Sequence, residues 1–102
     1  MPPARPAARK PVKAGLVHAP FVTRIDGARA VALAGDFNGW SPDAGRLTKK
    51  PDGTWTIDLL LAPGEYQYRL VVDGQWRDHP EAKRRVRNPY GTENGVLEVR
   101  AL

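Results

Sequence analysis

The chain has 102 residues and a formal net charge of +5, from 16 Lys and Arg against 11 Asp and Glu. This length provides for one hydrophobic core, and the sequence has no run of about 18 apolar residues that would cross a membrane. The absence of cysteine excludes disulfides and thiolate metal sites, and two histidines without a second ligand nearby give no reason to expect a metal or a cofactor.

The excess positive charge lies at the amino terminus. Residues 1–13 contain four basic residues, four prolines and no acidic residue, which leaves 12 basic and 11 acidic residues for the rest of the chain. Such a segment cannot bury enough apolar area to offset the entropy lost on ordering. We therefore predict a disordered basic arm over residues 1–14 and a folded domain over residues 15–102. Because no apolar secretory run is present, we expect the protein in the cytoplasm.

After His18, short apolar runs are broken by Gly, Pro, Asp and Asn, and no helical periodicity is sustained. This pattern predicts strands. In chain order they cover residues 21–26, 30–35, 54–59 and 65–72, a short strand that begins at Trp76, and residues 96–100. Short strands at this spacing predict an all-β, immunoglobulin-like β-sandwich of about seven antiparallel strands.

Alternation along two of these strands assigns their side chains to faces. In residues 54–59 the apolar positions place Trp55 in the core, whereas in residues 65–72 Arg69 falls on the face opposite the apolar set. We therefore expect Arg69 to be accessible to solvent. Asp73-Gly74 predicts a tight hairpin turn because both residues adopt positive φ readily.

Three turn regions carry aromatic and polar side chains that burial does not explain. Residues 35–42 contain Trp40, residues 73–76 end at Trp76, and residues 88–94 contain Tyr90. Aromatic side chains in polar, glycine-rich turns are more typical of ligand contact than of a core.

At these residues the chain resembles the family 48 carbohydrate-binding modules, which include the glycogen-binding domain of the AMP-activated protein kinase beta subunit and the amino-terminal domains of isoamylases and branching enzymes. The resemblance covers about residues 30–99 and rests on four segments in order, residues 31–40, 63–69, 72–76 and 88–94. It implies a β-sandwich that binds α-1,4-glucans such as glycogen or starch, as polysaccharide or oligosaccharide, with tolerance of α-1,6 branches.

Residue by residue, the resemblance assigns the two stacking tryptophans to Trp40 and Trp76 and the basic contact to Arg69. Further sugar contacts fall on Tyr90, Thr92 and Asn94. The chemistry agrees, because a glucose ring offers a face of C–H groups to an indole and a rim of hydroxyls to guanidinium, amide and hydroxyl groups.

We expect no enzymatic activity, because the sequence lacks a nucleophile-base pair, a phosphate-binding glycine loop and a convincing carboxylate pair. Asp36, Asp73 and Asp78 stand in or near turns, where aspartate commonly accepts backbone hydrogen bonds. In the family, catalysis belongs to a separate barrel domain, so the resemblance implies a glucan-metabolising enzyme or a kinase as a partner.

Two alternatives remain open from the sequence. A regulatory module could keep this fold and bind proteins. A nucleic-acid binder could combine the basic arm with the run from Lys83 to Arg87, although the aromatic side chains of an RNA-recognition sheet are missing from adjacent strands.

Overall fold

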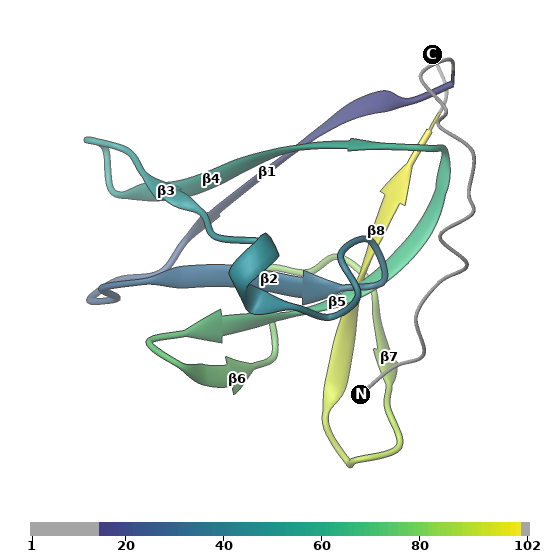
Figure 1. The fold of residues 1–102 in the computed structure, drawn as a ribbon. Coiled ribbons are helices and arrows are strands. Elements are labelled where there is room, and N and C mark those ends of the chain that lie inside the picture. The colour runs from purple at the N-terminus through teal and green to yellow at the C-terminus, as the bar shows by residue number, and fades with distance from the viewer. Residues whose placement is uncertain (1–14, 101–102) are drawn as a thin grey trace.

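Two antiparallel sheets lie face to face in the computed structural model, which describes residues 15–100 (Figure 1). The smaller sheet has the order β1-β4-β3, with β1 at Val17–Arg24, β4 at Thr54–Leu61 and β3 at Thr48–Lys49. The larger sheet has the order β2-β5-β8-β7, and β6 also pairs with β5. Its strands are β2 (Val31–Gly35), β5 (Gly64–Val72), β6 (Gln75–Arg77), β7 (Arg85–Arg87) and β8 (Glu93–Val99).

This arrangement confirms the predicted all-β, immunoglobulin-like sandwich. Two strands were missed, β3 with 2 residues and β7 with 3, because such short segments show no alternation. Strand β1 begins at Val17, four positions before the predicted start, and its register with β4 runs from Val17 opposite Leu61. Pro20 lies inside β1, which is tolerated because β1 is at the edge of its sheet.

The core lies between the sheets and draws side chains from both. Phe21 and Trp55 of the smaller sheet meet Leu33, Tyr68 and Leu70 of the larger one. The indole of Trp55 is 5% exposed, which confirms its predicted place in the core.

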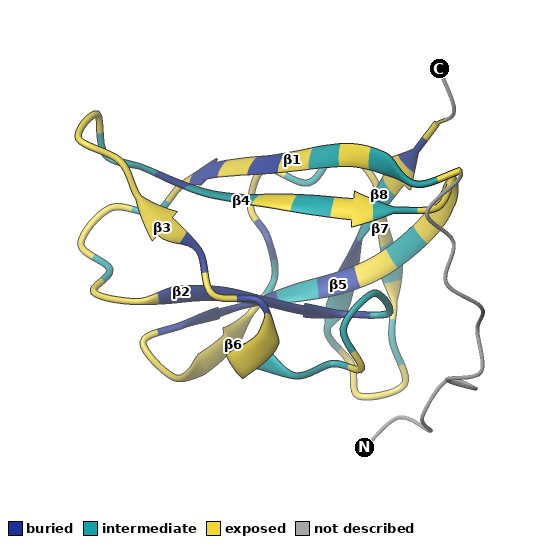
Figure 2. Cartoon of the chain, turned by 45° about the horizontal axis from the view of Figure 1, so that its top comes forward, coloured by how far each residue is buried: buried dark blue, intermediate teal, exposed yellow. Residues whose placement is uncertain are grey.

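Strand β2 is buried along its whole length, as Figure 2 shows. Val31 and Leu33 belong to the core cluster, whereas Ala32 and Ala34 form a second cluster with Val71 on the outer face of the larger sheet. Other side chains must therefore cover the outer face of β2, and Trp40 is one that packs there.

The hairpin between β5 and β6 has positive φ at both turn residues, 51° at Asp73 and 85° at Gly74, as predicted. The Asp73 Oδ1 atom accepts hydrogen bonds from the backbone N–H groups of Arg29 and Ala30, at 2.8 and 2.9 Å. These bonds lower the pKa of Asp73 and tie the hairpin to the start of β2.

His79, which the sequence gave no reason to regard as a metal ligand, belongs to a buried hydrogen-bonded chain. The Thr23 hydroxyl donates to Glu81 Oε1 at 2.8 Å, so His79 Nε2 must donate to Thr23 Oγ1 at 3.0 Å. His79 Nδ1 then accepts from the Tyr68 hydroxyl, 2.6 Å away. Burial lowers the pKa of His79 and raises the pKa of Tyr68 to about 12.

Within residues 15–100, no helix has the length and apolar character to span a membrane. The same residues contain no group of three or more His, Cys, Asp or Glu that could hold a metal ion. The predicted basic arm over residues 1–14 lies outside the described residues, so the division into arm and domain stays a prediction.

Candidate functional site

A row of three side chains crosses the outer face of the larger sheet. Ala32 of β2 is opposite Val71 of β5, and Val71 is opposite Trp76 of β6. Residues directly opposite each other in antiparallel strands share a face, so Trp76 projects from the same side as the two alanines of β2. It is 46% exposed, which leaves about half of the indole free for contact.

Trp40 lies on this same outer face because the chain turns back after β2. Gly39 and Trp40 have positive φ values of 66° and 61°, and the Gly35 carbonyl accepts hydrogen bonds from the backbone of both Asn38 and Trp40. The indole packs against Ala32, Ala34 and Val71. A tryptophan in the left-handed region is held there at a cost of about 1–2 kcal/mol, so the surrounding turn must impose the conformation.

The two indoles stand on the same face of the larger sheet, around Val71. Strands β2 and β6 lie on opposite sides of β5, Trp76 of β6 is opposite Val71, and Trp40 packs on the cluster that Val71 forms with the two alanines of β2. The Trp40 indole is also oriented by its Nε1–H, which donates to Asp36 Oδ1 at 3.2 Å. Ala32, Ala34 and Val71, together with the indoles of Trp40 and Trp76, thus form an apolar surface that we call the ledge.

Arg69 points to the outer face as predicted, but the expectation that it is freely accessible is wrong. Its side chain is 14% exposed, and its Nη2 atom donates to Asp78 Oδ1 at 2.6 Å. Its Nε atom is buried and has no hydrogen-bond partner among the described residues. The reason is the position of Asp78, which follows β6 close to the point where β5 exchanges β8 for β6 as its neighbour.

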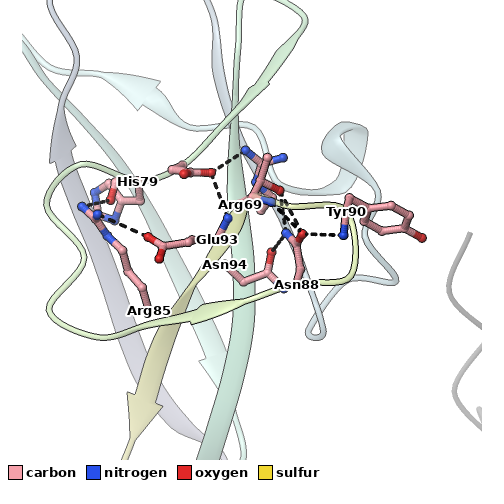
Figure 3. Close-up of polar contacts among 9 residues, drawn as sticks. Arg69, His79, Arg85, Asn88, Tyr90, Glu93 and Asn94 are labelled. Atoms are coloured by element: carbon pink, nitrogen blue, oxygen red, sulfur yellow. Dashed lines mark hydrogen bonds and ion pairs between the residues drawn. The ribbon is translucent and has the colours of Figure 1, made fainter.

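The loop between β7 and β8 carries two of the other predicted contacts, Tyr90 and Thr92, and the third, Asn94, lies on β8 (Figure 3). Tyr90 is 87% exposed, and Figure 3 shows its ring pointing away from the network around Asn88. Thr92 is half-buried, and Asn94 is 7% exposed, so Asn94 is less available than the sequence suggested. The Asn94 Nδ2 atom donates to Gln67 Oε1 of β5 at 3.0 Å, which joins this loop to the outer face.

The structure thus brings Trp40, Arg69 and Trp76 onto one face and, through Asn94 of β8, ties the loop of Tyr90 and Thr92 to it. Four residues hold these groups in place: the interpretation of the sequence missed Gln67 and Asn88, and it gave Asp36 and Asp78 a backbone-bonding role without their side-chain partners Trp40 and Arg69. Asn88 could have been found, because Asn-Pro is a turn-initiating pair whose side chain often bonds nearby backbone.

The positive charge of the basic run from Lys83 to Arg87 is partly balanced by ion pairs. Arg84 pairs with Glu65 at 2.7 Å, and Arg85 pairs with Glu93 at 3.6 Å. Arg85 also donates to the backbone carbonyls of His79 and Pro80. Two cations of the basic run, Arg84 and Arg85, are therefore paired with acidic residues of the same chain.

The family model described as the glycogen recognition site of AMP-activated protein kinase matches residues 21–102. The chain belongs to this family. All six predicted contacts lie within the matched residues.

Relatives in this glycogen-recognition family come from plants and animals. Protein FLOURY ENDOSPERM 6, chloroplastic, from Oryza sativa subsp. japonica is 38% identical over 79 residues, which are 78% of this chain and 14% of the rice protein. Protein PTST homolog 2, chloroplastic, from Arabidopsis thaliana is 36% identical over 72 residues, 71% of this chain and 13% of that protein. The 5'-AMP-activated protein kinase subunit beta-1 from Sus scrofa is 38% identical over 74 residues, 72% and 57% of the two chains.

The chain spans from 13% to 57% of the length of these relatives. The cytoplasmic location expected from the sequence is wrong as an inference, because two of the relatives are named as chloroplast proteins. Membership of the glycogen-recognition family therefore assigns no compartment.

Proposed function

We propose that this chain is a non-catalytic module that binds α-1,4-glucans through the outer face of its larger sheet. One observation carries the proposal: Trp76, 46% exposed, stands on the same outward face as the cluster of Ala32, Ala34 and Val71 on which Trp40 packs. Membership of the glycogen-recognition family supports the same ligand class. Two separated aromatic rings suit a coiled glucan, whose successive glucose units turn away from a common plane.

The polar groups around the ledge supply the rest of the recognition. Arg69 offers guanidinium hydrogens beside the ledge, Thr92 offers a hydroxyl and Asn94 the second hydrogen of its amide. The exposed ring of Tyr90 provides a further surface for a longer or branched chain. A shallow site of this kind binds weakly, with dissociation constants on the order of micromolar to millimolar.

The aspartates near this face are engaged structurally, which supports a non-catalytic role. Asp36 accepts hydrogen bonds from the Trp40 indole and the Gln67 backbone, and Asp78 pairs with Arg69. A catalytic carboxylate instead needs an approach to the reacting bond.

A titration tests the proposal directly. Tryptophan fluorescence of the full chain is followed while maltoheptaose, β-cyclodextrin or cellohexaose is added from micromolar to millimolar concentration. The two α-glucans should give a saturable change, whereas the flat β-1,4 chain of cellohexaose should not. Trp55 contributes a constant background because it is enclosed in the core. The proposal fails if neither α-glucan gives saturation.

The nucleic-acid alternative has less support, because the ion pairs of Arg84 and Arg85 occupy part of the basic run. It would be favoured by retention of the full chain on nucleic acid that weakens with salt and with Lys83→Ala/Arg87→Ala. A protein-interaction module with this fold would give neither glucan saturation nor such retention.

A glucan-metabolising enzyme or a kinase is proposed as the partner. The support comes from the kinase subunit among the relatives. Complex formation with a purified kinase or glucan-metabolising enzyme, measured by analytical ultracentrifugation with and without maltoheptaose, tests this part separately. Sedimentation of the two components as independent species in both conditions would reject that enzyme as the partner.

A further inference from the structure

The side chain of Asn88 contacts Tyr90 and Thr92 on its own loop and Asn94 on β8 (Figure 3). Its Oδ1 atom accepts hydrogen bonds from the backbone N–H groups of Tyr90 and Thr92, at 3.0 and 3.1 Å, and from the Thr92 hydroxyl at 3.0 Å. Its Nδ2 atom donates to Thr92 Oγ1 at 2.7 Å and to Asn94 Oδ1 at 3.0 Å. The amide is therefore used as acceptor and donor at once.

This network continues across the sheet to the other half of the site. Asn94 Nδ2 donates to Gln67 Oε1, and the backbone N–H of Gln67 donates to Asp36 Oδ2 at 2.8 Å. Asp36 in turn accepts the indole N–H of Trp40. A connected set of polar contacts thus runs from the Tyr90 loop to Trp40 through strands β8 and β5.

We propose that Asn88 is a positioning residue for glucan binding, which holds Tyr90, Thr92 and Asn94 in one arrangement before the ligand arrives. The inference rests on the proposed function and adds a residue that no sugar needs to touch. A loop whose geometry is fixed in advance loses less conformational entropy on binding, so the free protein binds more tightly.

The requirement is for an amide, because both its oxygen and its nitrogen have partners. A carboxylate of the same shape keeps the acceptor for the Tyr90 and Thr92 N–H groups but has no hydrogen to donate. In Asn88→Asp the new oxygen would face Asn94 Oδ1, another acceptor, at the distance of a hydrogen bond. That repulsion would turn the Asn94 amide away from Gln67 or move the loop.

The test measures maltoheptaose affinity of the full chain by isothermal titration calorimetry for the wild type and Asn88→Asp. Gln75→Glu serves as the charge-matched control. It also replaces an amide by a carboxylate, but Gln75 is exposed on β6 and lies outside this network. Asn88→Asp should bind about tenfold more weakly, from the loss of two donated hydrogen bonds, and Gln75→Glu should bind like the wild type.

A double-mutant cycle separates positioning from general destabilisation. In a Tyr90→Ala/Thr92→Val background, Asn88→Asp should cost less affinity than in the wild type, because two of the three groups that it positions are gone. Hydrogen exchange at the Thr92 amide should also accelerate in Asn88→Ala, which removes the acceptor of that amide, while exchange in β5 stays slow. If Asn88→Asp does not fold, Asn88→Ala replaces it, since it removes the same donors without adding charge.

The outcomes are distinguishable from failure of the proposed function. If the wild type does not bind maltoheptaose, the proposed function fails. If the wild type binds and Asn88→Asp binds equally well, or if the same fold-change persists in the Tyr90→Ala/Thr92→Val background, Asn88 is not a positioning residue.

Discussion

Replacing Trp76 by alanine should remove most of the glucan affinity and leave the fold nearly unchanged. Aromatic side chains carry about 150–250 Å² of surface, and 46% exposure leaves about 100 Å² of the Trp76 indole free. A pyranose ring that covers most of this surface gains about 1.5–2.5 kcal/mol at roughly 25 cal/mol per Å². Trp76→Ala should therefore weaken binding by a factor of about 10 to 70.

The other two tryptophans provide the comparison. Trp40→Ala should lower both affinity and stability, because the indole covers Ala32, Ala34 and Val71 and donates to Asp36. Trp55→Ala should cost about 3–5 kcal/mol of stability, the range for removing a core aromatic. Only Trp76 separates binding from folding, because its free surface faces solvent.

The assay pairs isothermal titration with maltoheptaose and urea unfolding followed by circular dichroism. Trp76→Ala should lose less than about 1 kcal/mol of unfolding free energy, the scale of a partly exposed substitution. Two results would refute the reasoning: an affinity equal to that of the wild type, or a stability loss as large as that of Trp55→Ala.

Three further predictions concern Ala34 and Asp78 near the outer face and His79 in the core. Ala34→Leu should lift Trp40 and cost about 1–3 kcal/mol in urea unfolding, together with weaker maltoheptaose binding; unchanged values for both would contradict the packing. Asp78→Asn should lower the unfolding free energy by about 1 kcal/mol and weaken glucan binding, because Arg69 is no longer held in place. Tighter binding in calorimetry would show that Asp78 does not orient Arg69 for the glucan. Because burial lowers the pKa of His79 below 6.5, the unfolded state takes up its proton first, so the unfolding free energy should fall as the pH drops from about 6.5 to 5. His79→Gln should flatten that slope, and an equal slope in both proteins would exclude His79 as its source.

Most of the fold could be predicted from the sequence because its strands alternate and its turns have unambiguous residues. Asp73-Gly74 has the positive φ values that such a pair favours, and Trp55 is in the core as its strand pattern indicates. The very short β3 and β7 could not be predicted, because two or three residues carry no period and form strands only through pairing with β4 and β8.

The faces of the site residues were predictable, but their availability was not. Alternation placed Arg69 outward, yet its exposure depends on Asp78, which is nine residues away and meets it only after β6 has paired with β5. The side chain of Asn94 is likewise buried by its hydrogen-bond partners Asn88 and Gln67. Long-range polar partners of this kind follow from tertiary packing, which strand periodicity does not encode.

The segment from β2 to Trp40 shows how the fold and the proposed site depend on the same residues. A strand at the edge of a sheet ordinarily exposes one face, yet β2 is buried on both, and its outward residues are alanines. Alanines leave space for a ring, and the two consecutive positive φ values at Gly39 and Trp40 return the chain so that the indole fills that space. The strained turn thus converts an apolar edge strand into a supported aromatic surface. Removing the indole would expose the alanines, and enlarging an alanine would displace the indole, so the proposed glucan platform and the packing of the larger sheet cannot be altered independently at this edge.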